Sequence, residues 1–465
     1  MPGFHVEHFG CRAARADGEA IGSRLSAAGQ HSVKQLSDAD VVIVNSCSVT
    51  AEADRQARAF IRRAHRLNPE AKIVVTGCYA QRAPEELAGI AGVAAVVGNS
   101  HKALAPQIIQ SILSVARTGA ADAAPALVSV QSLLSGNAQV WVDDRFAHSF
   151  IEEAQLVPGA QTRPNLKIQE GCGNRCSFCV IPQTRGSPKS LAAATVFRHV
   201  EEFVAAGGQE LVLSGINLGR WGRDFSSSEP SPRTLAELVR HLLECTGLPR
   251  LRLSSIEPMD WDSDLIALMR EFGGRRLARH AHLPLQSGSD AVLRRMFRRY
   301  RPWHYVEKIE ALLGAAGPDL TIGADVMVGF PGETDAEFAQ TLDFVRNLPF
   351  GYLHLFPFSP RPGTRAWPLH AESAVPHAVV ADRMAALRSL AAQKSRTHRE
   401  RFIGRELEAI TLHTPPALVA LGRSAALTGN FLPVEVDGQL PANRLLRVSL
   451  TGISPEGALQ ACHFA

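Results

Sequence analysis

Residues 166–179 read LKIQEGCGNRCSFC, a short apolar strand followed by three cysteines in the spacing C-x3-C-x2-C. Three thiolates on one short loop can converge on a single metal centre and leave one coordination position open. For zinc the open position is a water site, and for an iron–sulfur cube, usually held by four cysteines, it is an iron open to an outside ligand. Cys172, Cys176 and Cys179 are therefore predicted metal ligands, with a zinc loop completed by a distant His or Cys as the alternative.

Further strand-like runs follow this motif at intervals suited to repeated strand–helix units. They are LKIQ at 166–169, ELVLS at 210–214, LRLSS at 251–255, HLPL at 282–285, DVMVGF at 325–330 and LHLFPF at 353–358. Helical patterns separate most of them, among them ATVFRHVEEFVAA, which is followed by a Gly pair suited to a C-terminal cap. Because six units fall short of the eight in a full barrel, we expect an open, partial (β/α)6 barrel.

The first third of the chain also alternates strands and helices. VVIV at 41–44 and IVVT at 73–76 have strand length, and residues 51–66 between them carry apolar side chains at helical spacing, with Thr50 as the expected cap. Pro84 opens another helix. Strand–helix–strand order predicts a parallel, doubly wound α/β sheet.

A second set of three cysteines lies far apart in this first region. Cys47 and Cys78 each follow one of the two expected strands, and Cys11 follows the strand-like FHVEHFG. The loops after parallel strands lie at one edge of a sheet, so the three thiols can meet there. Three separately buried cysteines are the alternative, since Cys packs as a small hydrophobic residue.

Four segments are expected. Residues 1–118 form the N-terminal α/β domain, 119–160 a linker or peripheral segment where periodicity fades, 161–396 the partial barrel, and 397–465 a small antiparallel β domain with turns at 428–430 and 437–438.

Composition restricts the class of protein. With 45% hydrophobic and 20% charged residues the chain is globular, and its formal charge of +4 excludes an overall cationic coat. No apolar run reaches the length of a membrane span and no signal peptide is apparent, so we expect a cytoplasmic protein whose eight cysteines are reduced.

A series of sequence blocks runs in order along nearly the whole chain. They read ADVVIVNSCSVTAEADRQAR, IVVTGCYAQ and VVGN in the first third, then LKIQEGCGNRCSFCVIP, LSGINLG, RLRLSSIEP, HLPLQSGSDAVLRRM, DVMVGFPGET and FPFSPRPGT. In this order they resemble the radical S-adenosylmethionine methylthiotransferases, most closely the bacterial branch that modifies threonylcarbamoyladenosine at position 37 of tRNA. The C-terminal GRSAALTGNFLPVEV resembles the RNA-binding TRAM domain of that family.

The resemblance implies two 4Fe-4S clusters, one on Cys172, Cys176 and Cys179 and one on the second cysteine set. The first would bind S-adenosylmethionine and cleave it to a deoxyadenosyl radical. The second would carry the sulfur on which a methyl group is placed before the methylthio group passes to the base. Two molecules of S-adenosylmethionine are then consumed per product, and an electron donor of the flavodoxin or ferredoxin type is implied. One departure lies after Cys11, where Ala14 replaces a usual Asn and Asp17 a usual Glu.

Polar residues at the ends of the expected barrel strands are candidate contacts for S-adenosylmethionine. Asn217, for example, can donate to a carboxylate and accept from an amine. The candidates are Ser214, Gly215, Asn217, Glu257 and Gln286.

Two arginine-rich stretches are candidate contacts for tRNA phosphates. LRRMFRRYR at 293–301 adds Phe297 and Tyr300 for base stacking, and 388–405 carries six Lys or Arg against one Glu. Residues 406–465 hold three arginines against five acidic residues. We therefore expect most of the positive charge that binds the anticodon arm to come from the two arginine-rich stretches. The candidates are Arg294, Arg295, Arg298, Arg299, Arg396, Arg399 and Arg401.

Two other readings stay open. A sister enzyme would methylthiolate an aspartate of a ribosomal protein or isopentenyladenosine in tRNA. A non-enzymatic zinc or iron–sulfur RNA-binding protein would need neither the polar strand ends nor a second cysteine set.

Overall fold

The computed structural model describes residues 2–118, 138–146, 151, 156–158, 164–228 and 230–464. The chain divides into two compact units. The first comprises Met1–Gln155, Glu170–Asn174 and Cys179–Lys189, and the second Leu156–Gln169, Arg175–Phe178 and Ser190–Ala465. The C-x3-C-x2-C loop is divided between the two units, with Cys172 and Cys179 in the first and Cys176 in the second.

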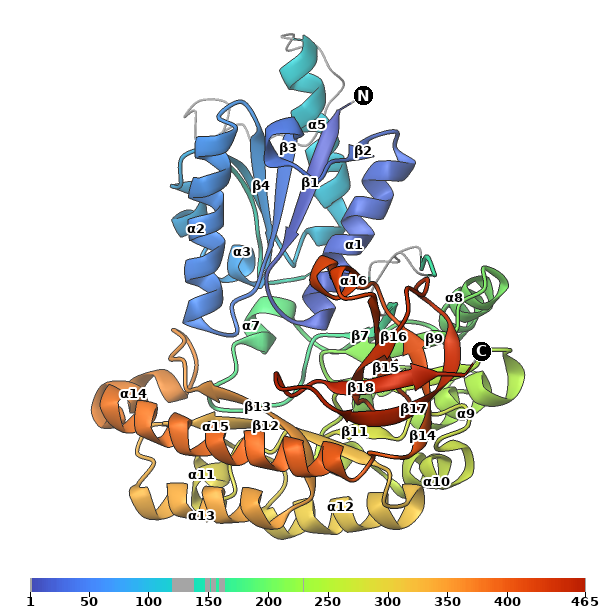
Figure 1. Ribbon diagram of the computed structural model, residues 1–465. Coiled ribbons are helices and arrows are strands. Elements are labelled where there is room, and N and C mark those ends of the chain that lie inside the picture. Colours follow the sequence, from blue (N-terminus) through green and yellow to red (C-terminus); the bar gives the residue numbers. More distant parts are fainter. Residues whose placement is uncertain are drawn as a thin grey trace. The chain divides into compact units, whose positions relative to one another are not determined.

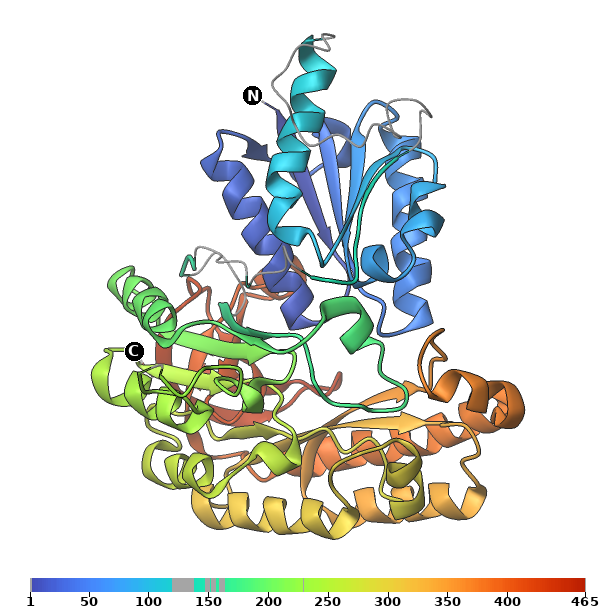
Figure 2. The ribbon, with the colours of Figure 1, turned by 180° about the vertical axis from the view of Figure 1, so that it is seen from behind.

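The first unit is built on a parallel sheet with helices on both faces (Figures 1 and 2). Its strands, in spatial order, are β2 (His31–Ser32), β1 (Gly3–His8), β3 (Val41–Ser46), β4 (Lys72–Gly77), β5 (Val93–Gly98) and β6 (Gln139–Trp141). Its helices are α1 (Arg12–Ala27), α2 (Ala51–Leu67), α3 (Cys78–Arg82), α4 (Pro84–Ala88), α5 (Ala105–Thr118) and α7 (Ile181–Arg185), with short 3-10 turns at Leu36–Asp38 and Lys102–Leu104. This confirms the predicted doubly wound sheet.

Alternation along β3 explains the two layers of core. Val41 and Ile43 pack under α1 and α5, whereas Val42 and Val44 pack under α2 on the opposite face. The Thr50 side chain accepts a hydrogen bond from the backbone N of Ala53 and so caps α2 as predicted.

The segment 119–160, predicted to be linker or peripheral structure, contributes an edge strand. Gln139–Trp141 pair in parallel with β5 and form the outer strand β6, at the periphery of the sheet. The signal was the apolar Val140-Trp141-Val142 run, too short to stand out from its polar surroundings. The remainder of that expectation falls largely outside the described residues.

The second unit contains the partial barrel. Two parallel groups of strands follow each other, in the orders β10-β9-β7-β8 and β11-β12-β13, and a bridge between Leu251 and Leu277 links them. The strands are β7 (Asn165–Glu170), β8 (Lys189–Ser190), β9 (Glu210–Gly215), β10 (Arg250–Leu253), β11 (His280–His282), β12 (Thr321–Val328) and β13 (Phe350–Pro357). A strand lies at or beside each of the six expected positions. The fourth, β11, shares only His282 with the expected 282–285, and β12 and β13 begin four and three residues earlier than expected.

Helices of the second unit separate these strands, and α15 packs along β13 (Figure 1). They are α8 (Ala193–Ala205), α9 (Leu235–Cys245), α10 (Ser263–Phe272), α11 (Asp290–Arg295), α12 (Pro302–Ala316), α13 (Asp335–Asn347), α14 (Ala366–Ser373), α15 (His377–Glu400) and α16 (Pro416–Ala420), with 3-10 turns at Leu218–Arg220 and Pro258–Asp260.

The C-terminal segment forms a small closed barrel in the order β14-β15-β16-β18-β17. Its strands are β14 (Glu406–Thr411), β15 (Arg423–Thr428), β16 (Pro433–Asp437), β17 (Leu445–Ile453) and β18 (Leu459–His463). All pairs are antiparallel except β16 with β18, which is parallel. The barrel starts after α15 ends at Glu400, a few residues later than the expected boundary at 397.

Candidate active site

The three N-terminal cysteines lie at the carboxyl ends of neighbouring parallel strands. Cys11 directly precedes α1, Cys47 follows β3, and Cys78 begins α3 directly after β4. Gly10 has φ +119°, and a Cβ atom at this position would lie 2.8 Å from the Sγ of Cys47. The loop that carries Cys11 therefore packs directly against Cys47, which only a glycine at position 10 permits.

Cys78 and Cys11 lie near enough to Cys47 to act on its thiol. Burial and then the nearby Cys78 and Cys11 raise the pKa of Cys47 to about 12. Neighbouring thiolates repel one another unless a cation lies among them, and a metal that binds them displaces their protons. The donor set therefore fits a thiolate-bound metal centre.

The sulfur of Cys78 accepts two hydrogen bonds from buried side chains. The donors are Arg185 Nε at 3.2 Å and Asn99 Nδ2 at 3.5 Å. Arg185 Nη2 is buried and has no hydrogen-bond partner among the described residues. Such an orphaned donor beside thiolate ligands fits an acceptor such as a cluster sulfide.

Four buried charged side chains surround this contact. Arg185 Nη1 lies 2.8 Å from Glu170 Oε1 and 3.0 Å from Asp17 Oδ2, and Lys102 Nζ contacts both carboxylates. Each of the four is at most 4% exposed. Burial alone lowers the pKa of Arg185, but Cys78, Glu170 and Asp17 raise it well above its ordinary value, so the guanidinium stays charged.

The structure shows the contacts of Ala14 and Asp17, the two residues that depart from the family pattern. Asp17 keeps an acidic group in the buried network, and the backbone oxygen of Ala14 accepts a hydrogen bond from Asn45 Nδ2. The sequence prediction missed Arg185, Lys102 and Glu170. The sequence offered a signal for two of them, because the charged residues Glu170 and Arg185 flank the cysteine motif in LKIQEGC and IPQTRG.

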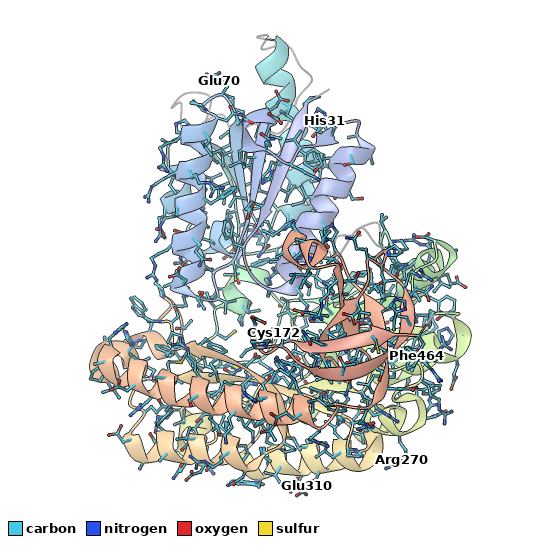
Figure 3. All side chains as sticks on the ribbon, in the orientation of Figure 1. His31, Glu70, Cys172, Arg270, Glu310 and Phe464 are labelled. Atoms are coloured by element: carbon cyan, nitrogen blue, oxygen red, sulfur yellow. The ribbon has the colours of Figure 1, made fainter. Side chains whose placement is uncertain are left out.

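The C-x3-C-x2-C loop follows β7, and Cys172 is labelled in Figure 3. Cys172 Sγ accepts a hydrogen bond from the backbone N of Asn174 at 3.5 Å. In the second unit, Cys176 Sγ accepts one from Arg298 Nη1 at 3.3 Å. All three cysteines of the loop are partly exposed free thiols.

Arg298 was expected to contact tRNA, but the structure places it beside Cys176. It is 7% exposed, lies 2.7 Å from Glu257 Oε1 and stacks over the ring of Tyr300. Burial lowers the pKa of Arg298, but Tyr300, Glu257 and Cys176 raise it well above its usual value. Arg298 is thus a fixed positive charge next to a predicted cluster ligand and is not available to a phosphate, and Tyr300 is fully buried rather than free to stack on a base.

The residues predicted to contact S-adenosylmethionine lie at strand ends. Ser214 and Gly215 end β9, Asn217 follows it, and Glu257 lies after β10. Gln286 follows β11 with φ +64°, a backbone conformation rare for residues other than glycine. The Ser214 hydroxyl and Gln286 Oε1 are buried without a hydrogen-bond partner in the described part of the chain. Both atoms are therefore able to hydrogen-bond to a bound polar ligand.

The other arginines predicted to contact tRNA differ in their exposure and in their hydrogen-bond and ion-pair partners. Arg294 pairs with Asp290, Arg299 with the buried Asp260, and Arg295 makes a bidentate pair with Glu337. On or just after α15, Arg396 is 76% exposed and pairs with Glu400, Arg399 donates to the backbone oxygen of Gly457, and Arg401 donates to that of Pro318. Among the arginines of this group that pair with acidic side chains, Arg396 has the most exposed side chain.

Two family models match the chain. The Uncharacterized protein family UPF0004 model covers residues 3–98, and the Radical SAM superfamily model covers residues 166–345. With its three-cysteine loop after the first barrel strand, this chain is a radical S-adenosylmethionine enzyme, a class that uses S-adenosylmethionine with a 4Fe-4S cluster.

Similarity to curated proteins narrows the class. The threonylcarbamoyladenosine tRNA methylthiotransferase MtaB of Aquifex aeolicus is 32% identical over 95% of this chain and 98% of its own length. The protein of the same name from Bacillus subtilis is 34% identical, covering 94% of this chain and 90% of its own. The tRNA-2-methylthio-N(6)-dimethylallyladenosine synthase of Acidothermus cellulolyticus is 32% identical over 97% and 84%. The chain belongs to the radical S-adenosylmethionine methylthiotransferase family and is an enzyme that transfers a methylthio group.

A solved structure supports the fold. The radical S-adenosylmethionine methyltransferase TsrM from Kitasatospora setae, with cobalamin and a [4Fe-4S] cluster bound, covers 80% of this chain and 78% of its own with a TM-score of 0.57 at 16% identity. In the described part of this chain, no helix has both the length and the apolar character needed to cross a bilayer.

Proposed function

We propose that this enzyme methylthiolates C2 of N6-threonylcarbamoyladenosine at position 37 of tRNA, with two 4Fe-4S clusters and two molecules of S-adenosylmethionine per product. Relatives named for this substrate align over most of the chain. The observation that carries the proposal is the position of Cys11, Cys47 and Cys78 at the carboxyl ends of the neighbouring strands β1, β3 and β4, because a radical reaction alone does not explain a second set of thiol ligands.

Each cysteine set has its own task in this proposal. Cys172, Cys176 and Cys179 hold the cluster that binds S-adenosylmethionine, and the N-terminal cysteines hold the other. When bound, these groups supply a radical able to take hydrogen from an unactivated C–H bond and a sulfur that carries the methyl group.

Two buried arginines place a positive charge beside a cysteine of each set. Arg298 holds a positive charge 3.3 Å from Cys176, and Arg185 holds one 3.2 Å from Cys78. Both lie in low-dielectric surroundings, where a fixed charge acts strongly on a nearby thiolate. Ser214 and Gln286 offer buried polar atoms for the amino-acid part of S-adenosylmethionine.

The closed C-terminal barrel and the exposed arginines of α15 are assigned to the anticodon arm of tRNA, and a flavodoxin- or ferredoxin-type protein to electron delivery. A sister substrate, dimethylallyladenosine, is the second candidate, because a relative named for it is also 32% identical, over 97% of this chain.

Mass spectrometry of tRNA nucleosides tests the substrate. A deletion strain should lack 2-methylthio-threonylcarbamoyladenosine, wild-type protein should restore it, and Cys47→Ala should not. Loss of methylthio-dimethylallyladenosine, or of methylthio-aspartate in a ribosomal protein, with the first nucleoside unchanged would assign the enzyme to a sister branch.

A further inference from the structure

Three side chains on neighbouring strands of the partial barrel form a cluster that contains no cysteine. His282 lies on β11, Asp325 on β12 and His354 on β13. The parallel register pairs Asp325 directly with His354, and His282 with Gly323, two residues before Asp325. Since every second residue of a strand points to the same face, the register brings the three side chains together.

The geometry within the cluster is close. His282 Nε2 lies 3.1 Å from Asp325 Oδ2, and His354 Nδ1 lies 3.2 Å from Asp325 Oδ1. One candidate ligand atom from each residue lies within 4.8 Å of the other two. Tetrahedral ligands about 2.0–2.1 Å from zinc are separated by about 3.3 Å, so the two short contacts already have the spacing of a coordination sphere.

A tyrosine holds the second nitrogen of His282. The Tyr352 hydroxyl lies 3.0 Å from His282 Nδ1 and 2.8 Å from His280 Nε2. A hydroxyl has one hydrogen, so when it donates to His280 it accepts from Nδ1–H of His282. His282 Nε2 then faces the Asp325 carboxylate with a lone pair, and this contact is attractive only with a proton or a metal ion between them. A metal-binding histidine usually donates its other ring N–H to such a hydrogen-bond partner, which fixes the orientation of the imidazole.

The backbone makes room for that support. Gly323 lies opposite Tyr352 in the register, and a Cβ atom at Gly323 would be 2.1 Å from Tyr352 Cζ. Any side chain at Gly323 would displace the tyrosine. His282 is 8% exposed, Asp325 25% and His354 62%, so the site is supported from inside and open to solvent on one side.

We propose that His282, Asp325 and His354 bind a divalent transition-metal ion, with Zn²⁺ the best match to two imidazoles and one carboxylate and a remaining position open to water. Such an ion joins three adjacent strands of the barrel and is independent of the cysteine centres. It needs no electron transfer, because the ligands bind through lone pairs and release only protons.

Zinc binding by the cluster-loaded full-length enzyme tests the proposal. Zinc is added, unbound metal is removed by desalting, and the product is examined by elemental analysis and zinc-edge X-ray absorption, to which iron does not contribute. We expect one zinc per chain with a shell of nitrogen and oxygen only. Sulfur in the zinc shell, or no retained zinc, would overturn the proposal.

Variants assign the ligands. His354→Ala, chosen because this side chain is largely exposed, and Asp325→Asn, which keeps the shape of the carboxylate, should each weaken zinc binding at least roughly tenfold. His413→Ala, at an exposed histidine elsewhere in the same unit, is the matched control and should bind like wild type. Iron content and circular dichroism check that the variants fold, and zinc binding unchanged in both ligand variants would contradict the assignment.

Discussion

Arg185 donates from Nε to the sulfur of Cys78 at 3.2 Å, across 107 positions of sequence. The contact places a fully buried positive charge against the sulfur of one cysteine of the N-terminal set. Because Glu170 and Asp17 balance that charge, the guanidinium is held in place as well as kept ionised. It is therefore a positioning residue of the second centre.

Replacing Arg185 should change the reduction potential of the second cluster. Hydrogen bonds to sulfur and nearby positive charge stabilise the reduced form. In a background of Cys172→Ala, Cys176→Ala and Cys179→Ala, which leaves one cluster, Arg185→Gln should lower the potential followed by electron paramagnetic resonance. Arg185→Lys keeps the charge and should lower it less.

Arg55→Gln is the control, since Arg55 lies in the same unit, is 66% exposed and pairs with Glu52 on α2. Its potential should match that of the background protein. A potential that does not move in Arg185→Gln, with iron content retained, would limit Arg185 to a structural role.

Iron counting should separate the two cysteine sets. After anaerobic reconstitution the wild type should hold about eight iron atoms, four in each cube. Cys47→Ala should keep about four and still cleave S-adenosylmethionine reductively, but should form no methylthio product. The triple variant of the other set should also keep about four and should cleave none.

Stoichiometric zinc in place of iron at the cysteines would contradict both assignments. Cys245→Ala is the control, because this thiol is exposed at the end of α9 and belongs to neither cysteine set. It should have wild-type iron and activity.

Neutralising exposed arginines of α15 should weaken tRNA binding in a salt-dependent way. Removing one arginine–phosphate interaction reduces the slope of log affinity against log salt by about one unit. Arg396→Gln, at a 76% exposed side chain, should show this effect in filter binding, whereas S-adenosylmethionine cleavage without tRNA should be unchanged.

Arg298→Gln should show the reverse pattern. Its side chain is buried against Cys176, so the salt slope should stay while the first cluster or its cleavage activity is impaired. An equal reduction of the salt slope in Arg298→Gln would return this residue to the tRNA-binding arginines.

Arg252 should be a main anchor between the C-terminal barrel and the strands beneath it. It pairs with Glu210 at 2.8 Å, donates to the backbone oxygen of Thr428 at 3.1 Å, and lies over the ring of Phe431. Burial raises the pKa of Glu210, but Arg252 and Arg250 outweigh it and leave the pKa below its ordinary value.

Removing one partner of a buried pair leaves an uncompensated charge, so Arg252→Ala should lower the free energy of unfolding by about 3–5 kcal/mol. Urea unfolding measures this decrease. Arg240→Ala, which breaks only surface pairs on α9, should change the midpoint little, and an equal shift in the two variants would contradict the anchoring role.

The sequence alone was enough wherever the deciding residues are close together in the chain. Apolar runs such as 41–44 and 73–76 became strands, Thr50 capped its helix, and the loop after β7 carried its three cysteines. Local propensity and spacing act over a few residues, so their outcome does not depend on what packs above them. The joint edge of Cys11, Cys47 and Cys78 was also predictable, because parallel strands share the direction in which they end.

Tertiary structure alone decided which distant charges meet. LRRMFRRYR has the composition of a phosphate-binding surface, yet the fold turns Arg298 inward to Cys176 and leaves Arg294 at the surface. Sequence shows the charge but not its burial, which depends on the order and register of strands. The same reason applies to Arg185 beside Cys78, and to His282, Asp325 and His354, which only the pairing of three strands brings into contact.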